Sequence, residues 1–253
     1  MPSLLIATTN PGKIREILPI LEGTSYRLLT LADIDGGIPE PAETGRTFAE
    51  NARLKASYYA AASGLLTVAE DSGLEIDALN GRPGIHSARY PGETYADKFN
   101  NLYRELAPHP RPWTARYICA VALVQSPESS VQSPASSVQG RELTAPLPHC
   151  LIAPLPLGPS APLTVFECVG VVEGELSPSP RGTHGFGYDP IFYFPEYGAT
   201  FGEVDDAMKL KVAHRGRAFR QLRDFLADSG LRTQDSGPWT QDSGPRTQDS
   251  GPV

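Results

Sequence analysis

The sequence predicts an α/β protein, and two observations lead to this class. Apolar, β-branched segments alternate with helical patterns in the first part of the chain, as they do in α/β folds. Residues 113–124 and 164–176 are long, apolar and rich in β-branched residues, which is typical of two neighbouring antiparallel strands. About 190 to 200 residues remain once two Ser/Pro-rich segments are set aside, enough for one well-buried domain.

The N-terminal elements are predicted from apolar periodicity and helix caps. Residues 3–8 are predicted to form a buried strand, and residues 26–31 a second one. Between them, Pro11 suits the first position of a helix and Asn10 suits its N-cap. Residues 47–50, Thr-Phe-Ala-Glu, have the capping-box pattern and predict an Ala-rich helix of roughly sixteen residues.

An acidic segment follows the next predicted strand, residues 65–70. Glu70 and Asp71 stand directly before Ser72-Gly73, where we predict a turn, and residues 74–79 alternate as a half-exposed strand does. Strand ends face the crevice of an α/β sheet, and a glycine lets the backbone approach a ligand closely. Asp71 is therefore a candidate metal-binding or water-activating acid, and the alternative is a solvated turn.

The remaining segments complete one predicted domain, residues 1–230. Thr94 and Asp97 predict a helix start, and residues 206–228 predict a final helix. The inward face of that helix carries Ala218, Leu222, Phe225 and Leu226. Residues 126–162 are dense in Ser, Pro and Gln, which predicts a flexible insertion between two strands. Residues 231–253 repeat a heptad with a proline in every unit, which predicts a disordered tail rather than a coiled coil.

Composition excludes several classes of protein. The net charge of −7 argues against a nucleic-acid polymer as a partner, because non-specific binding along a nucleic-acid backbone relies on clustered Lys and Arg. Cys119, Cys150 and Cys168 show no CxxC spacing, which favours reduced thiols over a disulfide framework or a zinc site. There is no leader pattern and no run of about 18 apolar residues, so we expect a soluble, cytoplasmic protein without a membrane partner.

Two segments suit the phosphates of a ligand. Residues 8–13, Thr-Thr-Asn-Pro-Gly-Lys, join a strand to a helix, so backbone amides, the helix dipole and the Lys13 ammonium suit a phosphate. The segment lacks the Walker A spacing, and a well-capped helix is the alternative. Glu43 lies in a Gly-flanked loop, and together with Asp71 it supplies the two carboxylates that a Mg²⁺ ion shared with a triphosphate requires.

Two later segments suit a nucleobase. Residues 185–190, Gly-Phe-Gly-Tyr-Asp-Pro, set aromatic rings and an acid among glycines, which offers a stacking face and a hydrogen-bond acceptor. A buried aromatic corner of the sheet is the alternative. Residues 209–217 form a cationic cluster in which Arg215 suits phosphate or carbonyl oxygens and His214 suits a purine oxygen. A solvated helix face is the alternative there.

Taken together and in this order, these segments resemble the non-canonical purine nucleoside triphosphate pyrophosphatases, the inosine/xanthosine triphosphatase or Ham1-like family. Five matches in order are far more specific than any one of them. The resemblance spans about residues 3–228 apart from the insertion. The matching segments are residues 7–13, 43–45 with 47–52, 70–74 through 83–90, 185–192, and Lys209 with His214-Arg215-Gly216.

The resemblance implies a fold, an activity and a role for each candidate residue. The fold is an elongated two-lobed α/β structure on a long central mixed sheet with flanking helices and a nucleotide cleft between the lobes, usually a homodimer. The activity is Mg²⁺-dependent hydrolysis of ITP, dITP and XTP to the monophosphate and pyrophosphate. Asp71 is implied as the general base and a metal ligand, with Glu43 as the other metal ligand. The implied substrate-binding residues are Thr8, Thr9, Asn10, Pro11, Gly12, Lys13 and Ser72 for the triphosphate, Phe186, Gly187, Tyr188 and Asp189 for the base, and Lys209, His214 and Arg215 for both.

Some features depart from the family pattern. Ala213 stands where the family usually has Ser before His-Arg-Gly, the insertion has no family counterpart of that size, and the heptad tail has none at all. Two other functions stay open at this point. One is a Maf-like pyrophosphatase acting on dTTP, UTP or modified pyrimidines, and the other is a nucleotide-binding sensor that does not hydrolyse its ligand.

Overall fold

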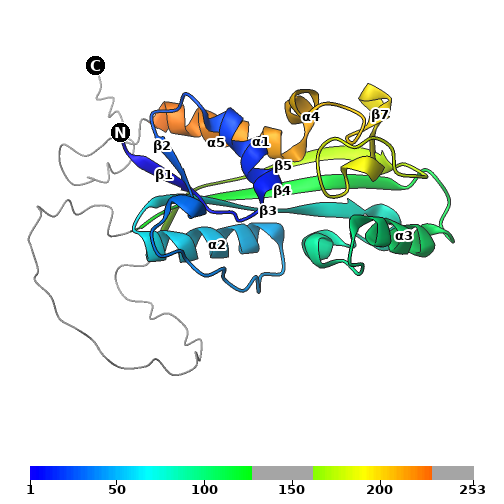
Figure 1. The fold of residues 1–253 in the computed structure, drawn as a ribbon, viewed down its shortest axis with the longest axis horizontal. Helices are drawn as coiled ribbons and strands as arrows, with labels where there is room; N and C mark the ends of the chain where they lie inside the picture. Colours follow the sequence, from blue (N-terminus) through cyan, green and yellow to red (C-terminus); the bar gives the residue numbers. More distant parts are fainter. Residues whose placement is uncertain (127–161, 230–253) are drawn as a thin grey trace, which may run out of the picture.

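The computed structural model describes residues 1–126 and 162–229, which form a seven-stranded mixed sheet with helices on both faces (Figure 1). The strands are β1 (Ser3–Ile6), β2 (Arg27–Thr30), β3 (Leu66–Ile76), β4 (Thr114–Gln125), β5 (Leu163–Leu176), β6 (Phe192–Phe194) and β7 (Ala199–Thr200). The helices are α1 (Pro11–Leu21), α2 (Phe48–Ser63), α3 (Tyr95–Leu106), α4 (Asp206–Val212) and α5 (His214–Ser229). The predicted α/β class is confirmed. Residues 127–161 of the predicted insertion and the predicted tail lie outside the described residues.

The sheet order is β2-β1-β3-β4-β5-β6-β7. β1 is parallel to β2 and β3, and all the other neighbouring strands are antiparallel. The long strands β3, β4 and β5 run the length of the elongated molecule (Figure 1). Residues 113–124 and 164–176 were predicted as neighbouring antiparallel strands, and the pairing of β4 with β5 confirms this.

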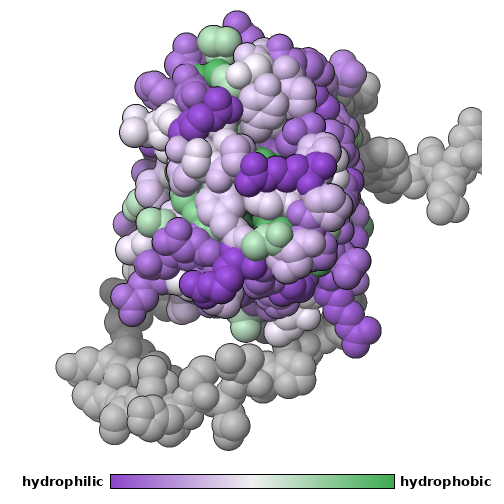
Figure 2. Space-filling view, turned by 90° about the vertical axis from the view of Figure 1, so that its right-hand side faces the viewer, coloured by the Kyte–Doolittle hydropathy of each residue, from purple (hydrophilic) through white to green (hydrophobic). Residues whose placement is uncertain are grey.

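The long strands join two lobes, each with its own core. In one lobe α1 and α5 cover one face of the sheet and α2 covers the other (Figure 1). Their apolar side chains form one cluster on each face. The other lobe contains α3, β6, β7 and the far ends of β3 to β5, packed around a third cluster rich in aromatic residues. The end of this lobe is largely hydrophilic with small apolar patches (Figure 2), so its core is covered there.

The predicted helix starts are largely confirmed. Asn10 caps α1, because its side-chain oxygen accepts hydrogen bonds from the backbone N–H groups of Gly12 and Lys13. Thr94 and Asp97 form a complete capping box at α3. The box predicted at residues 47–50 is half right. Thr47 accepts from the Glu50 N–H, but the Glu50 carboxylate accepts from the Arg46 N–H and not from Thr47.

The turn predicted at Ser72-Gly73 is wrong. Residues 66–76 form one continuous strand, and every residue from Thr67 to Ile76 is paired with β4. The polar and glycine residues resemble a turn locally, but the long partner strand keeps them extended. The half-exposed strand predicted at residues 74–79 is therefore the end of β3, followed by a short 3₁₀ turn at Asp77–Leu79.

The single final helix predicted for residues 206–228 is also wrong. Two helices, α4 and α5, meet at Ala213, whose extended backbone (φ −64°, ψ 153°) ends α4. Asp205 caps α4 by accepting a hydrogen bond from the Met208 N–H. The break places His214 and Arg215 in the first turn of α5, so the cationic cluster is divided between two helices.

Among the residues that the structure describes, no helix has the length and apolar content needed to span a bilayer.

Candidate active site

A cavity of about 270 Å³ lies where the two lobes meet, and its lining comes from both. β1 pairs with β3 only as far as Val68, so beyond this point β3 presents an open edge next to the carboxyl end of β1. Ligands of α/β sheets bind at such strand ends. The predicted site residues that line the cavity are Thr8, Thr9, Asn10, Lys13, Glu43, Asp71, Ser72, Phe186, Gly187, Tyr188, Asp189, Lys209, His214 and Arg215. Pro11 and Gly12 lie outside the lining.

Asp71 and Glu70 are neighbours in β3, but they face opposite sides of the sheet because side chains alternate along a strand. Glu70 and Ser72 face α1 and α5, where both contact Arg215. Asp71 faces α2, where it contacts Lys55. The two carboxylates predicted as one acidic pair therefore belong to two separate networks.

The α2 side of the cavity holds a compact group around Asp71. Lys55 Nζ lies 3.1 Å from Asp71 Oδ1 and 2.6 Å from Glu43 Oε1, so one ammonium bridges the two predicted metal carboxylates. Asn51 donates a hydrogen bond from Nδ2 to Asp71 Oδ2 at 3.1 Å and accepts one from the Gly45 N–H at 2.8 Å. Asn51 thus fixes the Asp71 carboxylate relative to the loop that carries Glu43.

The environment of Asp71 suits a base. Burial raises the pKa of the Asp71 carboxyl above its usual value. The Lys55 ammonium opposes this rise, while the charges of Glu43 and Glu70 add to it. A carboxylate with a raised pKa takes a proton from water more readily at neutral pH than an ordinary one.

On the other face of β3, Glu70 binds two cations. Its Oε1 lies 3.1 Å from Lys13 Nζ and 3.1 Å from the Arg215 guanidinium, and Cys119 Sγ lies 3.6 Å from Oε2. Burial by itself would raise the pKa of Glu70, but the charges of Lys13 and Arg215 lower it below its usual value. Glu70 is therefore a permanent anion that holds Lys13 and Arg215 beside the cavity.

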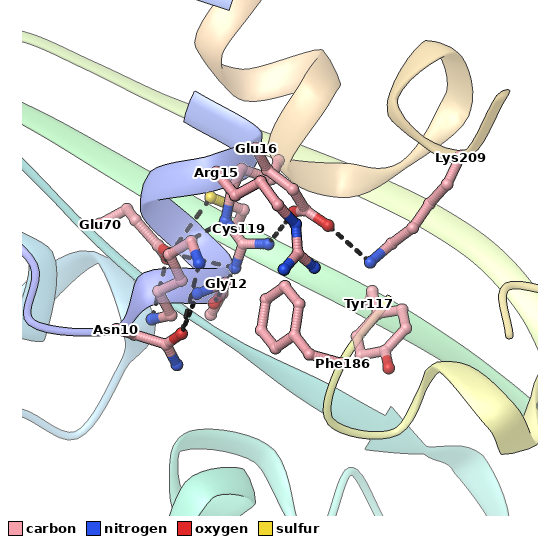
Figure 3. A network of polar contacts seen from close by, with 12 residues as sticks. Asn10, Gly12, Arg15, Glu16, Glu70, Tyr117, Cys119, Phe186 and Lys209 are labelled. Atoms are coloured by element: carbon pink, nitrogen blue, oxygen red, sulfur yellow. Dashed lines mark hydrogen bonds and ion pairs between the residues drawn. The ribbon is translucent and has the colours of Figure 1, made fainter. Parts of the chain in front are cut away.

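Glu16 on α1 extends this network. It forms an ion pair with Lys209 Nζ through one oxygen (Figure 3). Its other oxygen forms an ion pair with Arg215 Nη1. Lys209 Nζ is also paired with Asp189 Oδ2. The side chains of Glu16, Lys209 and Arg215 are each only 2% exposed. The solvated-face alternative is therefore wrong for Lys209 and Arg215, which are buried cations with fixed partners.

The predicted aromatic segment divides into two parts. Tyr188 is buried, and its hydroxyl donates to the backbone oxygen of Ser87 at 2.8 Å, as the alternative of a buried aromatic corner predicts. The half-buried Phe186 ring lines the cavity, with Lys209 Nζ 4.9 Å from its centroid. Gly12 lies against this ring, and a Cβ atom at Gly12 would approach it to 2.8 Å. Gly12 thus supports the ring from behind the cavity wall.

His214 presents an unsatisfied nitrogen. Its ring stacks on Tyr117 with centroids 4.6 Å apart and planes 16° apart. The buried Nδ1 atom has no hydrogen-bond partner among residues 1–126 and 162–229. Burial, with the charges of Arg215 and Lys209, holds the pKa of His214 well below its usual value. The imidazole is therefore neutral at physiological pH, with one nitrogen that donates and one that accepts.

Sequence reasoning missed several residues of the site. Lys55 and Asn51 stand four apart in the Ala-rich helix, so they share the face that meets Asp71, and this spacing was a usable signal. Glu16 stands three residues after Lys13, which places both on one side of α1. Tyr117 carried no signal, because a Tyr in an apolar strand is an ordinary core residue. Its hydroxyl contacts Asp189 Oδ1 at 3.3 Å.

Comparison with known proteins places these features in one family. The family model described as the Ham1 family matches residues 4–147 and 149–225. The dITP/XTP pyrophosphatase of Geobacter sulfurreducens is 41% identical over 234 residues, which cover 91% of this chain and 100% of that protein. The dITP/XTP pyrophosphatase of Thermus thermophilus is 38% identical over 225 residues, covering 89% of this chain and 92% of that one.

Solved structures of Ham1 proteins superpose on this chain over most of its length. A HAM1 protein from Coxiella burnetii superposes with a TM-score of 0.70 at 33% identity, covering 90% of this chain and 100% of that one. The Ham1 protein of Staphylococcus aureus superposes with a TM-score of 0.67 at 30% identity, covering 90% and 99%. The family match takes in every segment that lines the cavity, and it follows that this chain belongs to the Ham1 family.

Proposed function

We propose that this chain hydrolyses ITP, dITP and XTP to the monophosphate and pyrophosphate, with Mg²⁺ as cofactor. The observation that carries the proposal is one cavity that joins a carboxylate of raised pKa, Asp71, to an aromatic wall and a neutral imidazole, with cations between them. The relatives named dITP/XTP pyrophosphatase support the same class of substrate.

The polar end of the cavity suits a triphosphate. Lys13, Lys55 and Arg215 bring three positive charges to it, and they would offset the charge of the phosphate oxygens before a water approaches. Glu43 and Asp71 already share one cation, the Lys55 ammonium, so the same two carboxylates fit a Mg²⁺ ion that takes its other ligands from water and phosphate. When bound there, the ion would neutralise phosphate charge and acidify the attacking water.

Asp71 would act as the general base. Its carboxylate accepts a proton from a water whose oxygen then forms a bond to the α-phosphorus, and the bond from that phosphorus to the bridging oxygen breaks. Pyrophosphate leaves with the bridging oxygen, and the water oxygen stays on the monophosphate. Asn51 would keep the carboxylate aimed during this step, because it donates to Asp71 Oδ2 from the rigid helix α2.

The other end of the cavity suits a 6-oxopurine. The Phe186 ring offers a stacking face, and the neutral His214 offers an N–H group to the 6-oxo oxygen. ATP carries a 6-amino group in place of the 6-oxo group, so two hydrogen-bond donors would face each other at His214, which disfavours ATP binding.

The family resemblance also leads us to propose a homodimer, which size-exclusion chromatography with light scattering tests at micromolar concentration.

The activity is tested by pyrophosphate release from ITP, dITP, XTP, ATP, GTP and dTTP with Mg²⁺. We expect hydrolysis of the first three, and a loss of at least about 100-fold in kcat for Asp71→Asn, because the base is removed while the carboxamide keeps its shape. The exposed Asp224→Asn is the matched control and should keep full activity. Hydrolysis of dTTP alone would favour a Maf-like activity, and binding without hydrolysis would favour a sensor.

A further inference from the structure

Tyr95 lines the cavity, although it belongs to none of the motifs that predicted the site. It is the first residue of α3, and its side chain is 41% exposed, so it is not a core residue. Figure 1 shows α3 on the side of the sheet opposite to α4 and α5, which supply Lys209, His214 and Arg215. Tyr95 therefore reaches the cavity from a different wall than these residues.

The Tyr95 ring is held in place by its neighbours. It packs edge to face against Tyr188, with centroids 5.4 Å apart and planes 89° apart, and it is tilted against Phe99 at 6.1 Å. Lys98 Nζ lies 5.0 Å from the ring centroid. Because Tyr188 is itself tied to the Ser87 backbone, these contacts define the orientation of the Tyr95 ring before any ligand binds.

The Tyr95 hydroxyl is available to a ligand. It has no hydrogen-bond partner in the described part of the chain, whereas the charged groups of Asp71, Lys209 and Arg215 around the same cavity are all paired. A Cβ atom built on Gly187 would lie 3.5 Å from the Tyr95 hydroxyl oxygen, so the hydroxyl lies beside the Phe186–Asp189 segment. Burial and the charge of Asp189 raise the pKa of Tyr95, which keeps the phenol a donor at neutral pH.

Building on the proposed function, we propose that Tyr95 determines specificity by donating a hydrogen bond from its hydroxyl to the 2-oxo group of XTP. The hydroxyl lies at the end of the cavity assigned to the base and not at the triphosphate end. The 6-oxo group, common to all three substrates, is assigned to His214 on another wall. Among ITP, dITP and XTP, only xanthine carries a second oxo group on the base, and a phenol donor matches that acceptor.

The test compares kcat/KM for XTP, ITP and dITP between the native protein and Tyr95→Phe. This change removes one oxygen from a partly exposed side chain and keeps the ring contacts with Tyr188 and Phe99, so the fold is retained. We expect kcat/KM for XTP to fall about tenfold, as for the loss of one hydrogen bond, and the values for ITP and dITP to stay within about twofold. Tyr193→Phe on β6, outside the cavity lining, is the matched control.

Several results would overturn the proposal. An equal loss for all three substrates would indicate a structural role, and a changed ratio of ITP to dITP would indicate a contact with the sugar. Unchanged XTP turnover would exclude the contact. Equilibrium binding of XMP and IMP to both proteins gives the same selectivity without turnover, so a failure of this proposal is distinguishable from a failure of the proposed hydrolysis.

Discussion

At the scale of single residues, Glu70 and Asp71 show how one strand assigns opposite properties to adjacent carboxylates. Both are buried, but Glu70 lies between Lys13 and Arg215, and its pKa falls. Asp71 has the single ammonium of Lys55, which it shares with Glu43, and its pKa rises. The number of cations per carboxylate therefore decides which of the two suits a base.

His214 makes folding stability depend on pH. Its pKa in the folded protein is well below the unfolded value of about 6.5, mainly because of burial. Stability is therefore fully present above about pH 6.5, and it falls at lower pH, where the unfolded chain binds a proton that the folded chain does not. We therefore expect this residue to lower the unfolding free energy as the pH falls from about 6.5 towards 5.

Urea unfolding at several pH values, for the native protein and His214→Gln, measures this contribution. The variant should show a shallower decline of unfolding free energy over the same interval. The exposed His184→Gln is the matched control and should keep the native slope. A His214→Gln protein whose slope equals that of the native protein would contradict the prediction.

At the scale of elements, local signals predicted where helices start, but the continuity of β3 depends on pairing with a distant strand. Asn10 and Thr94 act within four residues of chain, so their caps were visible in the sequence. The continuity of β3 was not visible, because it depends on the ladder with β4, about fifty residues away. The break at Ala213 was also hidden, since alanine favours helix and only its backbone conformation separates α4 from α5.

Close packing of α5 on β5 positions the cationic end of the cavity. A Cβ atom at Gly170 would lie 2.1 Å from the backbone oxygen of His214 and 2.7 Å from the Ala218 nitrogen. Gly170→Ala must therefore push the first turn of α5, with His214 and Arg215, away from the sheet. We expect a loss of about 1–3 kcal/mol in unfolding free energy, and a fall of about 100-fold in kcat/KM for ITP, because the site is displaced.

Urea unfolding and pyrophosphate release measure the two effects together. Val169→Ala changes the adjacent strand position, whose side chain is 49% exposed, and should alter stability by less than about 0.5 kcal/mol. If Gly170→Ala kept native stability and activity, α5 would be free to shift without disturbing the site, and the packing argument would fail.

At the scale of the whole molecule, the site is assembled from segments distributed over most of the chain. Thr8 to Lys13, Asp71, and the segment from Phe186 to Asp189 meet only because β3, β4 and β5 join the two lobes. The motifs were therefore recognisable in the sequence by their order, whereas Tyr117, which looks like an ordinary core residue, could be assigned to the site only from the fold. The residues proposed to contact the ligand were predictable from the motifs, but the buried ion pairs that hold those residues in place were not.

The position of residues 127–161 in the chain predicts that they can be removed. They connect Gln125 to Leu163, which are paired at the adjacent ends of β4 and β5. Tyr117, the β4 residue that lines the cavity, is eight positions from Gln125, or roughly 26 Å along the strand. We propose that the domain formed by residues 1–126 and 162–229 folds and functions without residues 127–161 and 230–253.

The experiment replaces residues 127–161 with Asn-Gly, a sequence that suits a tight turn between antiparallel strands, and ends the chain at Ser229. Since the β4–β5 ladder and every cavity residue are retained, kcat/KM for ITP should stay within about twofold, and Tm should change by less than about 4 °C. A shorter loop also costs less conformational entropy to close when the protein folds, which favours an unchanged or higher Tm. A shortened protein that keeps its Tm but loses turnover would show that the removed segments contribute to catalysis.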